Sequence, residues 1–207
     1  MPEERSPRAP LEGGKKQAIM NAALAVITEK GYHPATIDEI AEKAGVGKGT
    51  IYLYFESKLA LVSELIDSVT RAHLNEMEKR IAQVQGAKEK LLVLAGVEFD
   101  FWRRHAPLAQ ILASGEMVGM AHELRDQMRA ARERYVRLIQ SVIEEGQRQG
   151  VFAPSIDAAL AAAIIFGARL SLFQFAAEHR GAQPDAIRGQ ALDFFLRALG
   201  AAPAREA

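Results

Sequence analysis

A capping box followed by a glycine turn restricts residues 36–54 to one local fold. In the run Thr36-Ile37-Asp38-Glu39, the threonine hydroxyl can accept from the backbone N–H three residues later, and the glutamate can reach back to the cap. Apolar residues then recur at three- and four-residue steps as far as Ala44, and Gly45 tolerates the left-handed conformation of a sharp helix end. The pattern predicts a short helix over 37–44, a tight turn, and a second short helix over 47–54.

Three positions indicate that these two helices pack against each other as a helix-turn-helix. Ala41 is small where the helices would cross, Gly45 permits the turn, and Ile51 falls on the inner face beside Ile40 and Val46. With that face buried, the N-terminal end of the second helix points outward. In helix-turn-helix proteins this end enters the major groove of DNA.

The side chains at this exposed end suit contacts with a DNA duplex. A lysine could reach guanine acceptors or phosphate, a glycine lets the backbone come close, and hydroxyl groups can donate to phosphate oxygens. The residues that supply these groups are Thr36, Lys48, Gly49, Thr50, Tyr52 and Lys58. The alternative is that Tyr52 and Tyr54 pack half-buried and that the lysines are merely solvated.

Charge does not help to decide between these alternatives. The chain has 26 basic and 26 acidic residues, and residues 1–60 are balanced as well, so any DNA contact depends on where single charges lie.

There is no cysteine, which excludes disulfides and thiolate metal sites and fits a cytoplasmic protein. Residues 1–13 mix acids, prolines and glycines without an apolar core, which predicts a disordered arm rather than a signal peptide.

The rest of the chain shows helical periodicity between glycine and proline breaks, and no strand pattern. We therefore predict an all-α fold with a helix-turn-helix domain at residues 14–58 and a larger helical domain at 59–207. The predicted helices outside the helix-turn-helix pair cover residues 15–30, 58–85, 88–105, 107–113, 121–149, 156–177 and 185–199.

Residues 36–58, TIDEIAEKAGVGKGTIYLYFESK, resemble the DNA-binding signature of the tetracycline-repressor (TetR) family of bacterial regulators. With the preceding helix, the resemblance covers about residues 14–60. It implies an all-helical homodimer whose three N-terminal helices bind operator DNA. It also implies a C-terminal helical domain that binds a small-molecule effector, which changes the affinity for DNA.

Transferred residue by residue, the resemblance implies DNA contacts at Thr36, Gly47, Lys48, Gly49, Thr50, Tyr52, Tyr54 and Lys58. Leu53 and Tyr54 stand where many members have tyrosine and histidine, which leaves the contact of Tyr54 open. The order Tyr-Leu-Tyr-Phe also occurs in members similar to acyl-CoA-responsive and efflux-pump regulators.

The two C-terminal helices carry more apolar surface than one small core needs. Their bulky residues include Ile164, Phe173 and Phe194, and the alanines within 158–163 permit close helix packing. Arg169, Ser171 and Gln174 interrupt the apolar run 158–177, which argues against a membrane span. We expect a symmetric contact between two subunits, with completion of a monomer core as the alternative.

Aromatic and methionine residues outline a candidate effector cavity, and the same residues could equally form core. The set comprises Phe99, Trp102, Met117, Met120, Phe166, Arg169 and Phe173. Arg169 stands out because a charge in an apolar helix needs a partner or a water-filled cavity. It could bind a carboxylate or phosphate of a ligand, or it could pair with Glu98, Asp100 or an acid at the subunit interface.

Enzyme classes find no support in the sequence. The histidines are scattered, no metal-ligand spacing occurs, and Gly45 to Thr50 does not have the order of a phosphate-binding loop, so no cofactor or metal is predicted. We predict a homodimeric repressor that binds operator DNA and is released by a small apolar or amphipathic effector. The alternative is a helical protein-interaction module without sequence-specific DNA binding, and a salt titration of duplex binding would separate the two.

Overall fold

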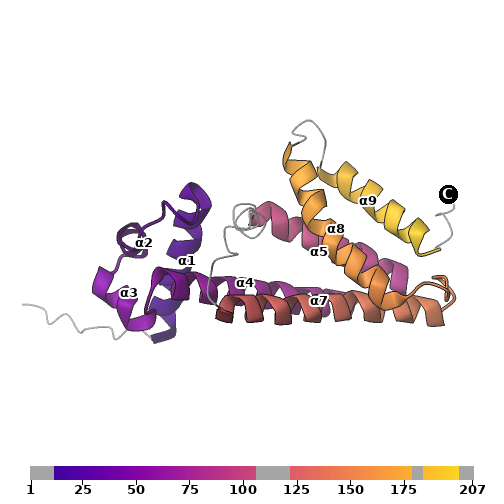
Figure 1. Cartoon of the computed structure of the whole chain (residues 1–207), viewed down its shortest axis with the longest axis horizontal. Helices are drawn as coiled ribbons and strands as arrows, with labels where there is room; N and C mark the ends of the chain where they lie inside the picture. Colours follow the sequence, from indigo (N-terminus) through magenta and orange to yellow (C-terminus); the bar gives the residue numbers. More distant parts are fainter. Residues whose placement is uncertain (1–11, 106–121, 179–183, 201–207) are drawn as a thin grey trace, which may run out of the picture. The chain divides into compact units, whose positions relative to one another are not determined.

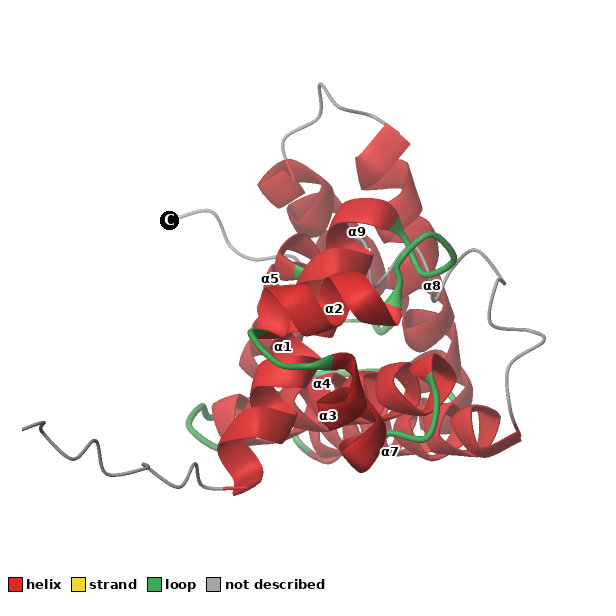
Figure 2. Ribbon diagram, turned by 90° about the vertical axis from the view of Figure 1, so that its left-hand side faces the viewer, coloured by secondary structure: helices red, strands yellow, loops and turns green. Residues whose placement is uncertain are grey.

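The computed structural model describes residues 12–105, 122–178 and 184–200. All regular elements in these ranges are helices (Figure 2), so the predicted all-α fold class is confirmed. The described residues divide into two compact units, one containing residues 12–67 and the other residues 68–105 together with the two later ranges. The predicted helix at 107–113 and the candidates Met117 and Met120 lie outside the described residues.

The first unit contains α1 (Glu12–Lys30), α2 (Ile37–Ala44), α3 (Lys48–Tyr54) and the beginning of α4 (Lys58–Ile81). Figure 1 shows α1, α2 and α3 grouped together. Each helix buries an apolar stripe against the others, which is how short helices gain stability that they lack in isolation. The largest fully buried residues of this core are Ile19, Ile27, Ile40, Ile51, Leu61 and Val62.

The structure contains the predicted helix-turn-helix, with both the capping box of α2 and the glycine turn that follows it. Glu39 N donates to Thr36 Oγ1 at 3.2 Å and Thr36 N donates to Glu39 Oε2 at 3.0 Å, which completes the capping box. Gly45 has φ 67° and ψ 33°, and Val46 N donates to Ala41 O at 3.0 Å. Such a left-handed glycine closes the last turn of α2 and reverses the chain into α3.

The second unit contains the remainder of α4, α5 (Ala87–Arg104), α7 (His122–Arg148), α8 (Ala158–Glu178) and α9 (Pro184–Ala198). Helix α7 packs against α5 and α8, and α9 also packs against both of them. Arg134 on α7 ties α4 into this unit by donating to Glu78 at 2.7 Å and to Asn75 at 2.8 Å. The buried core between these helices includes Leu74, Met77, Leu91, Leu94, Tyr135, Ile139, Val142, Ile143, Phe152 and Leu199.

Most predicted helix boundaries agree with the structure to within a few residues, and α4 differs most. It ends at Ile81 rather than at Gln85. The backbone N–H groups of Gln83 and Val84 donate to the carbonyls of Arg80 and Ile81, three residues earlier, instead of to those four residues earlier as in an α-helix. Gly86, at φ 86°, is the N-cap of α5.

Helix α8 is long and apolar enough to cross a membrane by length and composition, and it packs on the core of the unit through one face that includes Ala162, Ile165 and Phe166. Only 6% of its apolar window, Ala158–Ala176, is buried. Leu160 and Ile164 are 62% and 56% exposed, and Phe194 on the neighbouring α9 is 66% exposed. The second unit therefore presents a large uncovered apolar surface on α8 and α9.

Candidate nucleic-acid interface and effector cluster

Helix α3 presents one polar and aromatic face to solvent, and we call Lys48, Gly49, Tyr52 and Leu53 the reading face. Ile51 is fully buried, which turns these residues outward by the helical period. Tyr52 is 49% exposed and Leu53 is 82% exposed. Gly47 caps the helix without a side-chain hydrogen bond, so its N-terminal end stays open to a partner.

The lysine of the reading face is already engaged by an acid from α2. Lys48 Nζ donates to Asp38 Oδ2 at 2.8 Å, and both side chains are exposed. This hydrogen bond and the charge of Asp38 raise the pKa of Lys48. Lys48 therefore remains a cation that a phosphate or a guanine could take over from Asp38.

The other predicted contact residues lie around α3 in different environments. Thr36 is exposed but its hydroxyl serves the capping box, while Thr50 and Tyr54 are half-buried. Lys58 Nζ donates to His33 O at 3.2 Å and lies 4.4 Å from the centroid of the Tyr32 ring. Burial lowers the pKa of Lys58, although the Glu39 charge opposes this effect. In this conformation Lys58 is held by the loop before α2.

Several of the predicted effector residues come together in the second unit. Trp102 on α5 stacks on Phe173 of α8 with centroids 5.0 Å apart. The guanidinium carbon of Arg169 lies 4.2 Å from the centroid of Phe166 and 5.2 Å from that of Trp102. Phe99 is half-buried on α5 and has no ring contact with this group among the described residues.

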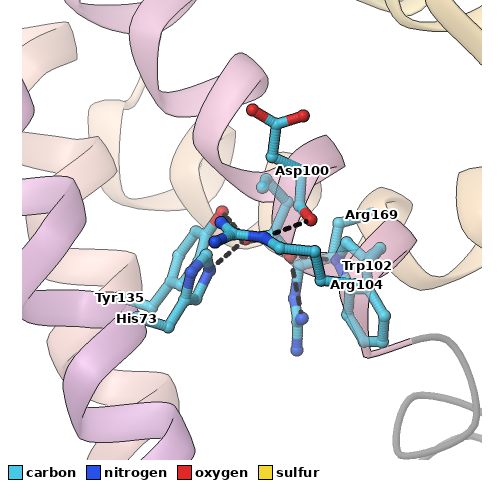
Figure 3. A network of polar contacts seen from close by, with 7 residues as sticks. His73, Asp100, Trp102, Arg104, Tyr135 and Arg169 are labelled. Carbon is cyan, nitrogen blue, oxygen red and sulfur yellow. Dashed lines mark hydrogen bonds and ion pairs between the residues drawn. The ribbon is translucent and has the colours of Figure 1, made fainter.

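A buried carboxylate, Glu98, holds this group together. His73 of α4, Trp102 of α5, Tyr135 of α7 and Arg169 of α8 gather in one place (Figure 3), and all four bond to Glu98. His73 Nε2 and Tyr135 OH lie 2.8 and 2.9 Å from Oε2. Arg169 donates to Oε1 at 3.1 Å and Trp102 donates to the same oxygen. We call these five residues the Glu98 cluster.

The donors of the cluster keep Glu98 ionised. Burial by itself raises the pKa of Glu98, but the His73 hydrogen bond and the Arg169 charge outweigh it and lower the pKa to about 2. For Tyr135, burial and then the Glu98 charge raise the pKa well above its ordinary value, so its hydroxyl stays a donor. Glu98 is thus a fixed carboxylate with four donors around it, and one of these donors is the cation Arg169.

Arg169 is incompletely paired although it lies inside this cluster. Three rings surround the guanidinium, those of Trp102, Phe166 and Tyr135, and one hydrogen bond joins it to Glu98. Its Nε is the one buried side-chain nitrogen or oxygen of the described residues that has no hydrogen-bond partner. Of the partners that the sequence left open, Glu98 is the one that the structure selects for the ion pair.

Sequence reasoning missed some members of both sites. Leu53 was not expected on the reading face, although Ile51 facing inward implies it. His73 and Tyr135 were not recognised, because they reach Glu98 from helices far apart in the sequence. The spacing Leu91, Leu94, Glu98 and Trp102 was an available signal, since it places an acid on the buried stripe of a helix.

Comparisons with known proteins agree with both units. Residues 19–65 match the family of "Bacterial regulatory proteins, tetR family", and residues 67–171 match the "YsiA-like protein, C-terminal region". The fatty acid metabolism regulator protein of Bacillus subtilis (strain 168) is 33% identical over 153 residues, which are 74% of this chain and 78% of that protein.

Solved structures give the same result over nearly the whole chain. The fatty acid degradation regulator FadR from Bacillus halodurans superposes with a TM-score of 0.78 at 26% identity, covering 97% of this chain and 100% of that chain. The transcriptional regulator FadR from B. subtilis, in complex with stearoyl-CoA, has a TM-score of 0.75 at 28% identity and covers 87% of this chain and 97% of its own. With a helix-turn-helix whose reading face points outward, the chain belongs to the TetR family of DNA-binding transcriptional regulators.

Proposed function

We propose that this chain is a homodimeric repressor that leaves its operator when an amphipathic effector with an acyl chain binds to its second unit. The observation that carries this proposal is the outward reading face of α3 within a stretch that matches the family over residues 19–65. Its place of action is the cytoplasm, and its role is regulatory rather than enzymatic. Residues 14–58 form the DNA-binding domain and residues 59–207 form the ligand-binding and dimerisation domain.

DNA contacts divide into base readout and phosphate positioning. Lys48 and Tyr52, both exposed on α3, approach the bases and phosphates of the major groove, while Gly47 and Gly49 allow the backbone to come close. Phosphate contacts complete the set at Thr36, Thr50, Tyr54 and Lys58. Lys58 must leave the His33 carbonyl to reach a phosphate, so its contact forms together with a local rearrangement.

A second copy of the chain covers the apolar surface of α8 and α9. The exposed side chains Leu160, Ile164 and Phe194 support this arrangement, because so much apolar surface on a soluble protein marks an interaction site. A two-fold dimer also supplies two reading faces for the two half-sites of an operator.

The effector class rests on the relative from B. subtilis whose structure contains stearoyl-CoA. In the present chain the rings of Trp102, Phe166 and Phe173 provide apolar surface beside a polar centre at Glu98 and Arg169. Phe99, Met117 and Met120 complete the proposed apolar lining. An amphipathic molecule combines the two chemical properties that such a site recognises.

Release from DNA follows if the effector prefers a dimer whose reading faces no longer fit successive major grooves. The ratio of effector affinities in the two dimer states then sets the extent of induction. The effector also binds less tightly when operator DNA is present, by the same factor.

Selection from a random duplex pool by the purified protein, followed by fluorescence anisotropy with the selected duplex, tests this function. We expect one enriched motif with two-fold symmetry, binding that weakens steeply with salt, and release by decanoyl-CoA. Lys48→Ala and Tyr52→Ala should lose affinity with unchanged helix content, whereas Lys79→Ala, an exposed lysine of α4 outside the interface, should not. Absence of an enriched motif would favour the protein-interaction alternative.

A further inference from the structure

The Glu98 cluster contains one donor that the fold leaves without an acceptor. Arg169 Nε is buried and has no hydrogen-bond partner, while the same guanidinium donates to Glu98 at 3.1 Å. A buried unsatisfied N–H is unfavourable, and structures usually avoid it by supplying an oxygen acceptor. The site is therefore incomplete at one defined atom.

The charge balance of the cluster restricts which acceptor fits there. The Arg169 cation already has its counterion in Glu98, whose own oxygens are fixed by His73, Trp102 and Tyr135. An acceptor at Nε would bind the same guanidinium whose Nη1 donates to Glu98 Oε1. Because Glu98 already neutralises the Arg169 cation, a second carboxylate there would gain little attraction and would be repelled by Glu98, whereas a carbonyl oxygen meets no such repulsion.

The surroundings of Arg169 indicate what is attached to that oxygen. The rings of Phe166, Tyr135 and Trp102 surround the guanidinium, and Phe173 stacks on Trp102. A ligand that reaches Nε has its neighbouring atoms against these rings, so an apolar chain is favoured next to the oxygen.

We propose that Arg169 Nε–H donates to an uncharged acyl oxygen of the effector, as in an ester or thioester, and that Glu98 is a charge filter that disfavours the corresponding free acid. This inference rests on the proposed function, because it assumes an effector with an acyl chain. It assigns the selection between acid and ester to one residue, Glu98, and the binding of the oxygen to another, Arg169.

Glu98→Gln is the variant that tests the filter without removing the network. The glutamine oxygen can accept from Trp102 and Arg169, as the carboxylate does. Its NH2 group can donate to His73 and to the Tyr135 hydroxyl oxygen. The substitution removes one negative charge and changes little in shape.

Fluorescence of Trp102, the single tryptophan of the chain, reports ligand binding inside the cluster. The full-length protein and its Glu98→Gln variant are titrated with decanoate and with methyl decanoate, and the ratio of the two Kd values is formed for each protein. Comparing these ratios cancels the different hydrophobicity of the two ligands. We expect the preference for the ester to fall about ten-fold in Glu98→Gln, because the acid gains affinity. An unchanged ratio would overturn the proposal.

Arg169→Met should weaken binding of methyl decanoate and decanoyl-CoA by about ten-fold, since it removes the donor. If this variant loses its helical circular dichroism, Arg169→Lys replaces it, because lysine keeps the charge beside Glu98 but lacks Nε–H. Arg137→Met, an exposed arginine of α7 paired with Glu133 at 3.6 Å, is the matched control and should bind like the wild type. Wild-type affinity in the folded Arg169 variant would contradict the proposed hydrogen bond.

The outcomes separate this inference from the function on which it rests. If decanoyl-CoA releases the operator but Glu98→Gln leaves the acid-to-ester ratio unchanged, the repressor function stands and the charge filter is wrong. If none of the three ligands binds the wild-type protein, the proposed effector class is wrong and the filter fails with it. Operator binding without any ligand response would still support the DNA-binding part.

Discussion

Ionised Glu98 should make the stability of the second unit depend on pH in a specific window. Its pKa falls from an ordinary 4.5 to about 2 on folding, so the folded protein holds this carboxyl deprotonated where the unfolded chain protonates it. A lowered folded-state pKa contributes stability that is present above pH 4.5 and is lost as the pH falls towards 2. The shift corresponds to about 3 kcal/mol, of which about 2 kcal/mol is lost by about pH 3.

Glu98→Gln isolates this contribution because it cannot titrate. Urea unfolding followed by Trp102 fluorescence at about pH 6 and about pH 3 gives the loss of unfolding free energy for each protein. We expect the wild type to lose about 2 kcal/mol more than Glu98→Gln over this interval. Asp185→Asn serves as a control, since the Asp185 side chain is 78% exposed and should leave the wild-type dependence in place. Equal losses in wild type and Glu98→Gln would refute the assignment of a strongly ionised Glu98.

Three further changes test other parts of the structure. Asp38→Asn should raise operator affinity several-fold at low salt, because Lys48 is no longer held at 2.8 Å; an unchanged anisotropy titration would contradict this. Gly146→Ala should cost about 1–3 kcal/mol in thermal unfolding, since the new Cβ would lie 2.1 Å from the Phe152 ring, and wild-type stability would show that the ring can yield. Phe194→Glu should shift sedimentation towards the monomer, and an intact dimer would exclude α9 from the interface.

Local chemistry explains why the sequence predicted the first unit so well. The Thr36 capping box, the Gly45 turn and the buried Ile51 depend on residues within about five helical turns of one another, and each has a strong preference of its own. The outward direction of Lys48 and Tyr52 then follows from the helical period. The partner of Lys48 did not follow, because the pairing with Asp38 depends on the packing angle between α2 and α3.

The residues that surround Glu98 in the second unit could not be predicted from the sequence. Helical periodicity was enough to show that Arg169 interrupts an apolar helix and needs a partner, and Glu98 was one of several acids that could pair with it. Only the packing of α4, α5, α7 and α8 brought His73, Tyr135 and Arg169 to one carboxylate and left a single nitrogen unpaired. Helical periodicity assigns each residue to a face of its own helix, whereas the meeting of four faces depends on side-chain packing across the whole unit.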